Sequence, residues 1–186
     1  MKGEEEMKLP ESKLKLTLVF TLVVLVVAIG LCQLCQWCGL PEQNQIQTVR
    51  ALKGMLGWNR EFLKALAQVL IMAPLLEEPL FRLLLFRLPA RLVCKDESRS
   101  MIAAPWVLVI AVFSSVLFSM AHNIDAASIA AGRGFAMLPL SDAFVSLFVL
   151  GFSWCWLYRH TRSIWCSMLS HFLFNLINLI LLFSFS

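Results

Sequence analysis

Residues 69–86 read VLIMAPLLEEPLFRLLLF, an apolar run that carries two adjacent glutamates and one arginine. The run belongs to a longer apolar segment, 62–86. This segment is long enough to cross a bilayer, because a spanning helix needs about 20 largely apolar residues. Charged side chains inside such a helix are costly and need partners within the protein. The stretch therefore predicts a membrane helix that turns its charged side chains toward other helices.

The rest of the chain is similarly apolar. Of the 186 residues, 59% are hydrophobic and 15% are charged, and the mean hydropathy is +0.76. Soluble domains have about 45–50% apolar and about 25% charged residues. A soluble core cannot bury so much apolar side chain without leaving large exposed patches. The composition excludes a disordered chain and an ordinary soluble enzyme, and it predicts an all-α, polytopic transmembrane helix bundle.

About five segments are long and apolar enough to span the membrane. They are 14–38, 62–86, 103–122, 139–158 and 164–184. Polar connections are expected over 39–60, 87–100 and 123–138, and a short basic link over 158–162. We therefore expect a cytosolic N-terminal tail over 1–13, a first transmembrane helix over 14–38 and a core over 60–184.

Basic residues are divided unequally between the two sides that five spans define. With a cytosolic N-terminus, ten Lys and Arg residues lie in cytosolic segments and five lie on the opposite side. Cytosolic loops carry an excess of Lys and Arg, which favours this orientation and places the C-terminus outside. No block of Lys and Arg marks a nucleic-acid patch, so we expect no nucleic-acid partner.

The three charges of the run 69–86 are not equivalent. Glu78 and Arg82 are four residues apart, so they share a helix face and can pair. Glu77 is rotated from Glu78 by about 100° around the helix, and Arg82 does not neutralise both. A buried structural ion pair accounts for Glu78 and Arg82 alone. The surplus carboxylate of Glu77 indicates a functional site, since intramembrane ionisable residues usually have a function.

Further polar side chains lie in the apolar segments: His122 ends the third segment, and His171 and Asn175 lie one turn apart in the fifth. A lone intramembrane histidine is often only a hydrogen-bond partner between helices. Together with Glu77, however, these residues can supply a general base for water and donors for an oxyanion. Five equal spans would place Glu77, His122 and His171 at different depths, so the helix ends or a kink at Pro74 must bring them together.

Three motifs occur in order along the chain. Glu77–Arg82 (EEPLFR) matches EExxxR, Phe118–His122 (FSMAH) matches FxxxH, and His171–Asn175 (HFLFN) matches HxxxN. In order and spacing they resemble the CPBP family, also called the Abi or CAAX-protease-like family of intramembrane endopeptidases. The resemblance covers roughly residues 60–180.

The resemblance implies a role for each motif residue. Glu77 would act as general base on water with His122 as its partner, and His171 and Asn175 would stabilise the tetrahedral oxyanion. Glu78 would belong to the catalytic set and pair with Arg82, and Phe118 would support the site.

Positions beside the motifs depart from the family pattern. Leu83 stands where many members have Gly, Arg162 where Gly often precedes the Ser, and Cys166 where Pro is common. These are positions of helix packing and helix starts, so the departures concern local geometry more than chemistry.

The expected activity is hydrolysis of a peptide bond in a membrane-associated or prenylated, CAAX-type protein or peptide, with the lipid bilayer as the surroundings. We expect no cofactor; the alternative is a zinc-dependent protease with Glu77, His122 and His171 as ligands. A second alternative is a non-enzymatic protein for peptide binding or bacteriocin immunity, and a third is a small transporter with a proton relay. The compact form and the lack of an organelle-targeting signal indicate the bacterial cytoplasmic membrane.

Two further patterns have simple structural interpretations. Cys32, Cys35 and Cys38 form C-x-x-C-x-x-C, which we interpret as small apolar residues of a membrane helix because no fourth ligand is evident. Tryptophans near the expected span ends fit an interfacial belt. They are Trp58, Trp106, Trp154, Trp156 and Trp165.

Overall fold

A computed structural model describes residues 10–41, 60–94, 104–123 and 141–185. Every regular element in these ranges is helical, as the composition predicts. The elements are α1 (Glu11–Trp37), α3 (Arg60–Ala67), η1 (Gln68–Met72), α4 (Ala73–Glu78), η2 (Pro79–Arg87), α5 (Leu88–Val93), α6 (Pro105–Asn123), α8 (Ala143–Thr161) and α9 (Ile164–Phe185).

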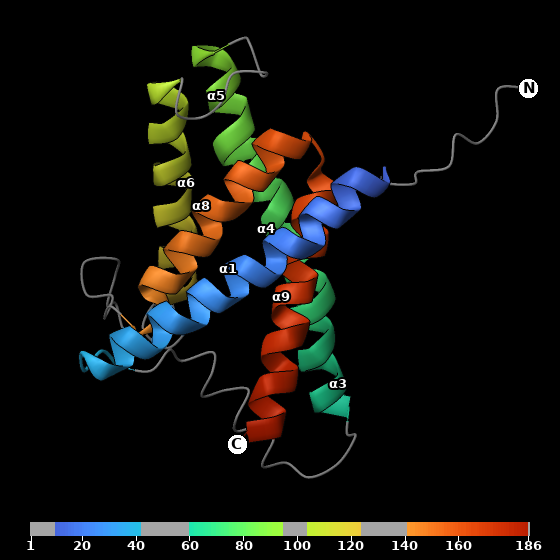
Figure 1. The fold of residues 1–186 in the computed structure, drawn as a ribbon, viewed down its shortest axis with the longest axis vertical. Coiled ribbons are helices and arrows are strands. Elements are labelled where there is room, and N and C mark those ends of the chain that lie inside the picture. Colours follow the sequence, from blue (N-terminus) through green and yellow to red (C-terminus); the bar gives the residue numbers. More distant parts are fainter. Residues whose placement is uncertain (1–9, 42–59, 95–103, 124–140, 186) are drawn as a thin grey trace, which may run out of the picture.

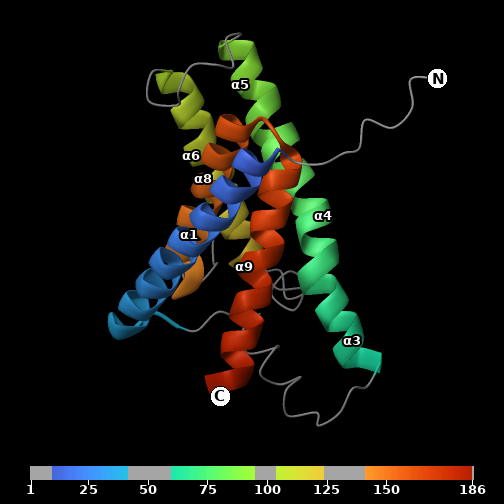
Figure 2. The same cartoon turned by 45° about the vertical axis from the view of Figure 1, so that its right-hand side comes forward.

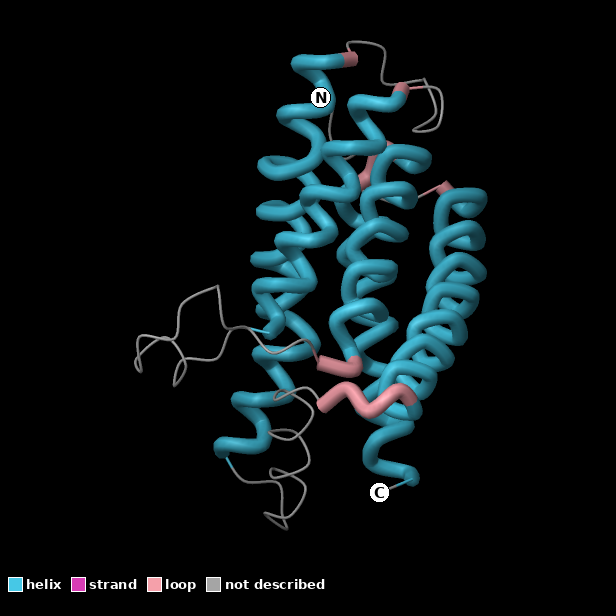
Figure 3. The backbone as a smooth tube through the Cα atoms, turned by 90° about the vertical axis from the view of Figure 1, so that its left-hand side faces the viewer, coloured by secondary structure: helices cyan, strands magenta, loops and turns pink. Residues whose placement is uncertain are grey.

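Elements α3 to α5 follow one another without a break and form one helical rod over residues 60–93. This rod packs with α6, α8 and α9, and α1 lies across α8 and α9 (Figure 1). The helices of the bundle run side by side over most of their length (Figure 3). Within the described ranges, Glu11–Trp37, Pro105–His122 and Ile164–Leu181 are long and apolar enough to cross a membrane. The fold is an all-α membrane helix bundle.

Some helix ends differ from the sequence prediction. The first helix begins at Glu11, inside the expected tail. Residues 87–93 were expected in a polar connection but are helical. The basic link expected over 158–162 is also shorter, because α8 continues through Thr161. The reason is shared: long basic side chains at a span end can reach the headgroups without ending the helix. The connection expected over 123–138 lies, from residue 124 onward, outside the described residues.

The rod changes its winding where prolines interrupt it. In η1 the N–H of Ala73 bonds to the carbonyl of Gln68, five residues back. The next bond of this pattern would come from residue 74, but Pro74 has no N–H. The carbonyl of Val69 is therefore left without its helical partner, and the Nδ2–H of Asn175 in α9 donates to it at 2.8 Å. Wide turns of this kind occur often at functional sites.

Small residues allow α6 and α8 to approach closely. A Cβ atom on Gly151 would lie 3.2 Å from the Cα of Ser115 and 3.3 Å from Cδ1 of Phe118. Small residues let membrane helices pack backbone to backbone. This contact holds Phe118 of α6 against Trp154 of α8, with their ring centroids 5.7 Å apart.

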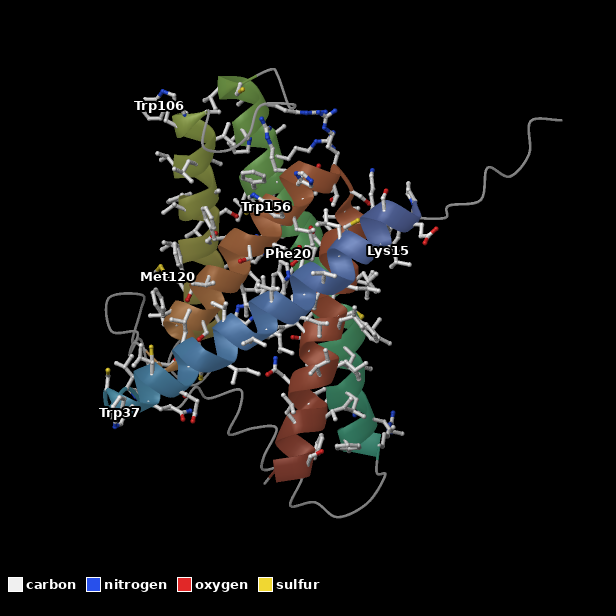
Figure 4. All side chains as sticks on the ribbon, in the orientation of Figure 1. Lys15, Phe20, Trp37, Trp106, Met120 and Trp156 are labelled. Carbon is white, nitrogen blue, oxygen red and sulfur yellow. The ribbon has the colours of Figure 1, made fainter. Side chains whose placement is uncertain are left out.

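Helix α1 is attached to the bundle along its length. Phe20 stacks on Trp156 of α8 with centroids 5.3 Å apart (Figure 4). Further along, the hydroxyl of Ser146 donates to the carbonyl of Ala28 at 2.9 Å. The opposite face of α1 exposes large apolar side chains, including Val19 and Val26, which suits contact with lipid.

The Glu78–Arg82 ion pair lies in the centre of the bundle. Arg82 Nε donates to Glu78 Oε2 at 3.0 Å, and both side chains are 0% exposed. The guanidinium also lies 5.4 Å from the ring centroid of Phe118 and 5.7 Å from that of Trp154. Its Nη1 donates to the sulfur of Cys155 at 3.5 Å. The pair expected from the i,i+4 spacing therefore joins the rod to α6 and α8.

Removing the charge of Arg82 should be strongly destabilising. Arg82→Met leaves the Glu78 carboxylate buried without its cation, and we expect the free energy of unfolding to fall by about 3–5 kcal/mol. The matched control is Lys15→Met, because Glu11 and Lys15 also form an i,i+4 pair, at 2.6 Å, but are mostly exposed. There the loss should be under about 1 kcal/mol. Unfolding by SDS in mixed micelles measures both, and equal losses would contradict the central role of the buried pair.

The turn between α8 and α9 requires an unusual backbone conformation. Arg162 follows α8 with φ 53° and ψ 30°, the left-handed region. Its N–H bonds to the carbonyl of Tyr158 at 2.7 Å and closes the helix. This is the position where the family pattern often has Gly, and glycine adopts this conformation without the steric cost of a Cβ.

We expect Arg162→Gly to raise the free energy of unfolding by about 1 kcal/mol, since it removes the left-handed strain. Arg162→Ala is the control, because it removes the same charged side chain but keeps a Cβ. Thermal unfolding in detergent compares the two variants. An equal gain in Arg162→Ala would show that the side chain, and not the backbone conformation, causes the effect.

Candidate active site

Glu77 brings three helical elements together at one point. Its side chain, at the end of α4, is 26% exposed. Glu77 Oε2 lies 3.4 Å from Nε2 of His122 in α6 and 4.0 Å from Nε2 of His171 in α9. The three residues singled out by separate motifs therefore face each other, although the motifs are far apart in the sequence.

The helices meet at this point because they are staggered. Both α3 and the second half of α9 extend past the end of α6 (Figure 2). His122, near the end of α6, therefore reaches the middle of the long rod and the first half of α9. Five spans of equal depth, as assumed from the sequence, would have separated these residues. The rod of residues 60–93 is roughly 50 Å long at 1.5 Å per residue, longer than the hydrocarbon core.

The backbone of α6 orients His122. Its Nδ1 lies 2.9 Å from the carbonyl oxygen of Phe118, one turn earlier. A carbonyl only accepts hydrogen bonds, so Nδ1 must carry the proton. In the neutral ring Nε2, the atom that faces Glu77, is then an acceptor. Phe118 also packs on the ring, with centroids 4.4 Å apart.

His171 is held by Glu78 and by Trp154. Its Nδ1 lies 3.0 Å from Glu78 Oε1, while the other oxygen of Glu78 accepts from Arg82. The Glu78 carboxylate accepts on both sides, so His171 Nδ1 donates. The indole of Trp154 stacks on the imidazole with centroids 4.2 Å apart and planes 22° apart. The hydrogen bond to Glu78 and the stacking on Trp154 together fix the orientation of the imidazole. Its Nε2 atom therefore faces Glu77.

The geometry gathers hydrogen-bond acceptors around one position. Glu77 Oε2 is buried and has no hydrogen-bond partner among the described residues. A buried carboxylate oxygen without a donor is costly. With the neutral His122 described above, its Nε2 and this oxygen are two acceptors that point to the same place, and Nε2 of His171 lies beside them. Such a place attracts a molecule with two donor hydrogens, and water is the smallest.

The remaining motif residues lie around this centre. Glu78, Arg82 and Phe118 form the buried layer behind it. Asn175 lies one turn beyond His171 on α9, and its Nδ2–H donates to Val69 of η1. In this structure Asn175 thus connects α9 with the rod beside Glu77.

Sequence reasoning missed the contribution of α8. Trp154 was interpreted as part of an interfacial belt, and this is wrong: it is 1% exposed and stacks on His171. Trp106, Trp156 and Trp165 are exposed, as the belt requires, and Trp58 is outside the described residues. The signal for Trp154 is its neighbour Gly151, one turn earlier, which allows α8 to approach the FxxxH helix.

The sequence contains two candidate sets of metal ligands: Glu77 with His122 and His171, and the three cysteines of C-x-x-C-x-x-C. In the part of the chain that the structure describes, no group of three His, Cys, Asp or Glu side chains lies where it could hold a metal ion. Cys32, Cys35 and Cys38 lie at the end of α1, and none of them forms a disulfide with another described residue.

Comparison with known proteins agrees with the motifs. The family model of type II CAAX prenyl endopeptidases, Rce1-like, matches residues 59–177, which is more than half of the chain. This range includes all three motifs. No curated protein and no solved structure matches the chain. With its long apolar helices and its motif residues, this integral membrane protein belongs to the Rce1-like family of type II CAAX prenyl endopeptidases.

Proposed function

We propose that this protein is an intramembrane endopeptidase that hydrolyses a peptide bond of a membrane-associated or prenylated protein, with water activated by Glu77 and His122. One observation carries the proposal: Glu77 Oε2 faces the Nε2 atoms of His122 and His171 at 3.4 and 4.0 Å. The family supports a CAAX-type substrate.

The first step is activation of water. A water held at Glu77 Oε2 donates one hydrogen to the carboxylate and can donate the other to Nε2 of His122. When Glu77 accepts the proton, the water oxygen attacks the substrate carbonyl carbon, and the carbonyl oxygen becomes an oxyanion. The oxyanion then re-forms the carbonyl, the C–N bond breaks, and Glu77 gives its proton to the nitrogen of the leaving amine. A base positioned in this way contributes about 10²- to 10⁴-fold to the rate.

The oxyanion needs donors on the opposite side of the carbonyl. We assign this role to His171 and Asn175. His171 donates from Nε2 only when its ring carries both protons, and the Glu78 carboxylate at Nδ1 balances that charge. Asn175 has a second N–H besides the one that bonds to Val69. Donors held in place before the reaction stabilise the developing charge most effectively.

The charge distribution supports a cytosolic N-terminus. Among the described residues, six Lys and Arg residues belong to the start of α1, the end of η2, α5 and the end of α8 with its following turn, and these segments lie toward the same end of the bundle (Figure 1). They are Lys13, Lys15, Arg87, Arg91, Arg159 and Arg162. Arg60 and Lys64 lie at the opposite end. The positive-inside rule favours the first end as cytosolic. We place the protein in a bacterial cytoplasmic membrane.

We propose a mechanism without a metal. The steps above use only side chains of the chain. A zinc-dependent reaction is the alternative, in which Glu77, His122 and His171 would be ligands.

Proteolysis by the purified protein tests the proposal. Quenched peptides with and without a prenyl group are incubated with the wild type and with Glu77→Gln and His122→Ala. We expect Glu77→Gln to lower kcat at least about 100-fold, because the amide cannot accept the proton. His122→Ala should also lower kcat. Adding a chelator should leave kcat unchanged.

The controls are chosen from the same residue types. Glu11→Gln removes an exposed carboxylate, and His160→Ala removes a histidine that stacks on Trp156 away from Glu77; both should cleave normally. Loss of cleavage on adding chelator would favour the zinc mechanism. Absence of cleavage by folded wild-type protein that still binds peptide would favour the binding-protein function instead.

A further inference from the structure

Helix α1 lies outside the region matched by the family model, residues 59–177, yet it reaches the candidate site through buried hydroxyl groups. We propose that Thr21 of α1 is a positioning residue for His171 and acts through Ser170 and Trp154. The expected effect of Thr21 on kcat rests on the proposed function. The effect of Thr21 on the position of the His171 ring can be measured without any activity.

A continuous chain of hydrogen bonds connects these residues. The indole N–H of Trp154 donates to Ser170 Oγ at 3.0 Å. Ser170 Oγ lies 2.8 Å from Thr21 Oγ1, and Thr21 Oγ1 lies 2.7 Å from the carbonyl oxygen of Thr17. Ser170 and Thr21 are both buried.

The direction of the chain follows from proton counting. A hydroxyl has one hydrogen, and a carbonyl can only accept. Thr21 satisfies both of its contacts only if it donates to Thr17 and accepts from Ser170. Ser170 then donates to Thr21 and offers a lone pair to Trp154. Each hydrogen has an acceptor. This series of hydrogen bonds, which begins in α1, therefore fixes the position of the Trp154 indole.

Trp154 transmits this order to the site. Its ring covers His171 at a centroid distance of 4.2 Å and touches Phe118 edge-on at 5.7 Å. The indole N–H fixes the rotation of the ring, because a buried N–H without an acceptor is costly. The stacked ring in turn limits where the imidazole of His171 can lie relative to Glu77.

Removing the Thr21 hydroxyl should break the chain at its source. In Thr21→Val the shape is kept, but Ser170 loses its acceptor. A serine in a helix can rotate and donate to the carbonyl four residues back. Its lone pairs then turn away from Trp154, the indole N–H loses its partner, and the ring moves over His171.

Histidine NMR of the full chain in detergent measures this directly. The protein has three histidines, so ring labelling gives few signals, and the His171 signal is assigned by substitution. Thr21→Val and Ser170→Ala are compared with Thr21→Ser, which keeps the hydroxyl. Thr17→Val is the matched control, since Thr17 is a buried threonine of the same helix whose hydroxyl donates to Lys13 O, 2.8 Å away, and the substitution keeps the Thr17 carbonyl.

The His171 signal should move in Thr21→Val and in Ser170→Ala, because the ring current of Trp154 changes. It should return in Thr21→Ser and stay in place in Thr17→Val. With a cleavable prenylated peptide, kcat in Thr21→Val should fall roughly 10- to 100-fold while KM is little changed, as expected for a small misplacement of a catalytic group.

An unmoved His171 signal in Thr21→Val overturns the inference at any level of activity. A moved signal with unchanged kcat in an active enzyme also overturns it, because the chain then has no catalytic consequence. If the wild type cleaves no peptide, the proposed function fails separately, and the His171 signal still decides whether Thr21 positions the ring.

Discussion

The buried pair of Glu78 and Arg82 is the interaction on which the rest of the structure depends. Removing two charges from water costs several kcal/mol for each ion unless they pair with good geometry. Both side chains must therefore stay at the centre of the bundle. Arg82 lies against Phe118 and Trp154, and the second oxygen of Glu78 holds His171. One ion pair thus orients the rod relative to α6, α8 and α9.

This arrangement gives two adjacent glutamates different roles. Glu78 is enclosed and bonded on both oxygens, which suits a structural carboxylate. Glu77 is turned by about 100° toward the two histidines and is partly exposed. Neighbouring carboxylates in different environments commonly divide structural and chemical work. The division here follows from helix geometry, since only one of the two can face Arg82.

The helical class and the pairing of Glu78 with Arg82 could be predicted from the sequence, because apolar length and i,i+4 spacing are local properties. The stagger of the helices could not, since it depends on packing contacts such as Gly151 against α6. That stagger decides whether His122 reaches Glu77. The interior position of Trp154 was missed for the same reason: a tryptophan near a span end looks interfacial until its neighbours are known.

The central claim is that Glu77, His122 and His171 meet at one place in the bundle. Ring-labelled histidine spectra of Glu77→Gln test it most directly, without substrate. His160 provides the internal reference, because it stacks on Trp156 away from Glu77. We predict that the signals of both His122 and His171 move while that of His160 does not. A His122 signal that is unchanged in Glu77→Gln would contradict the claim.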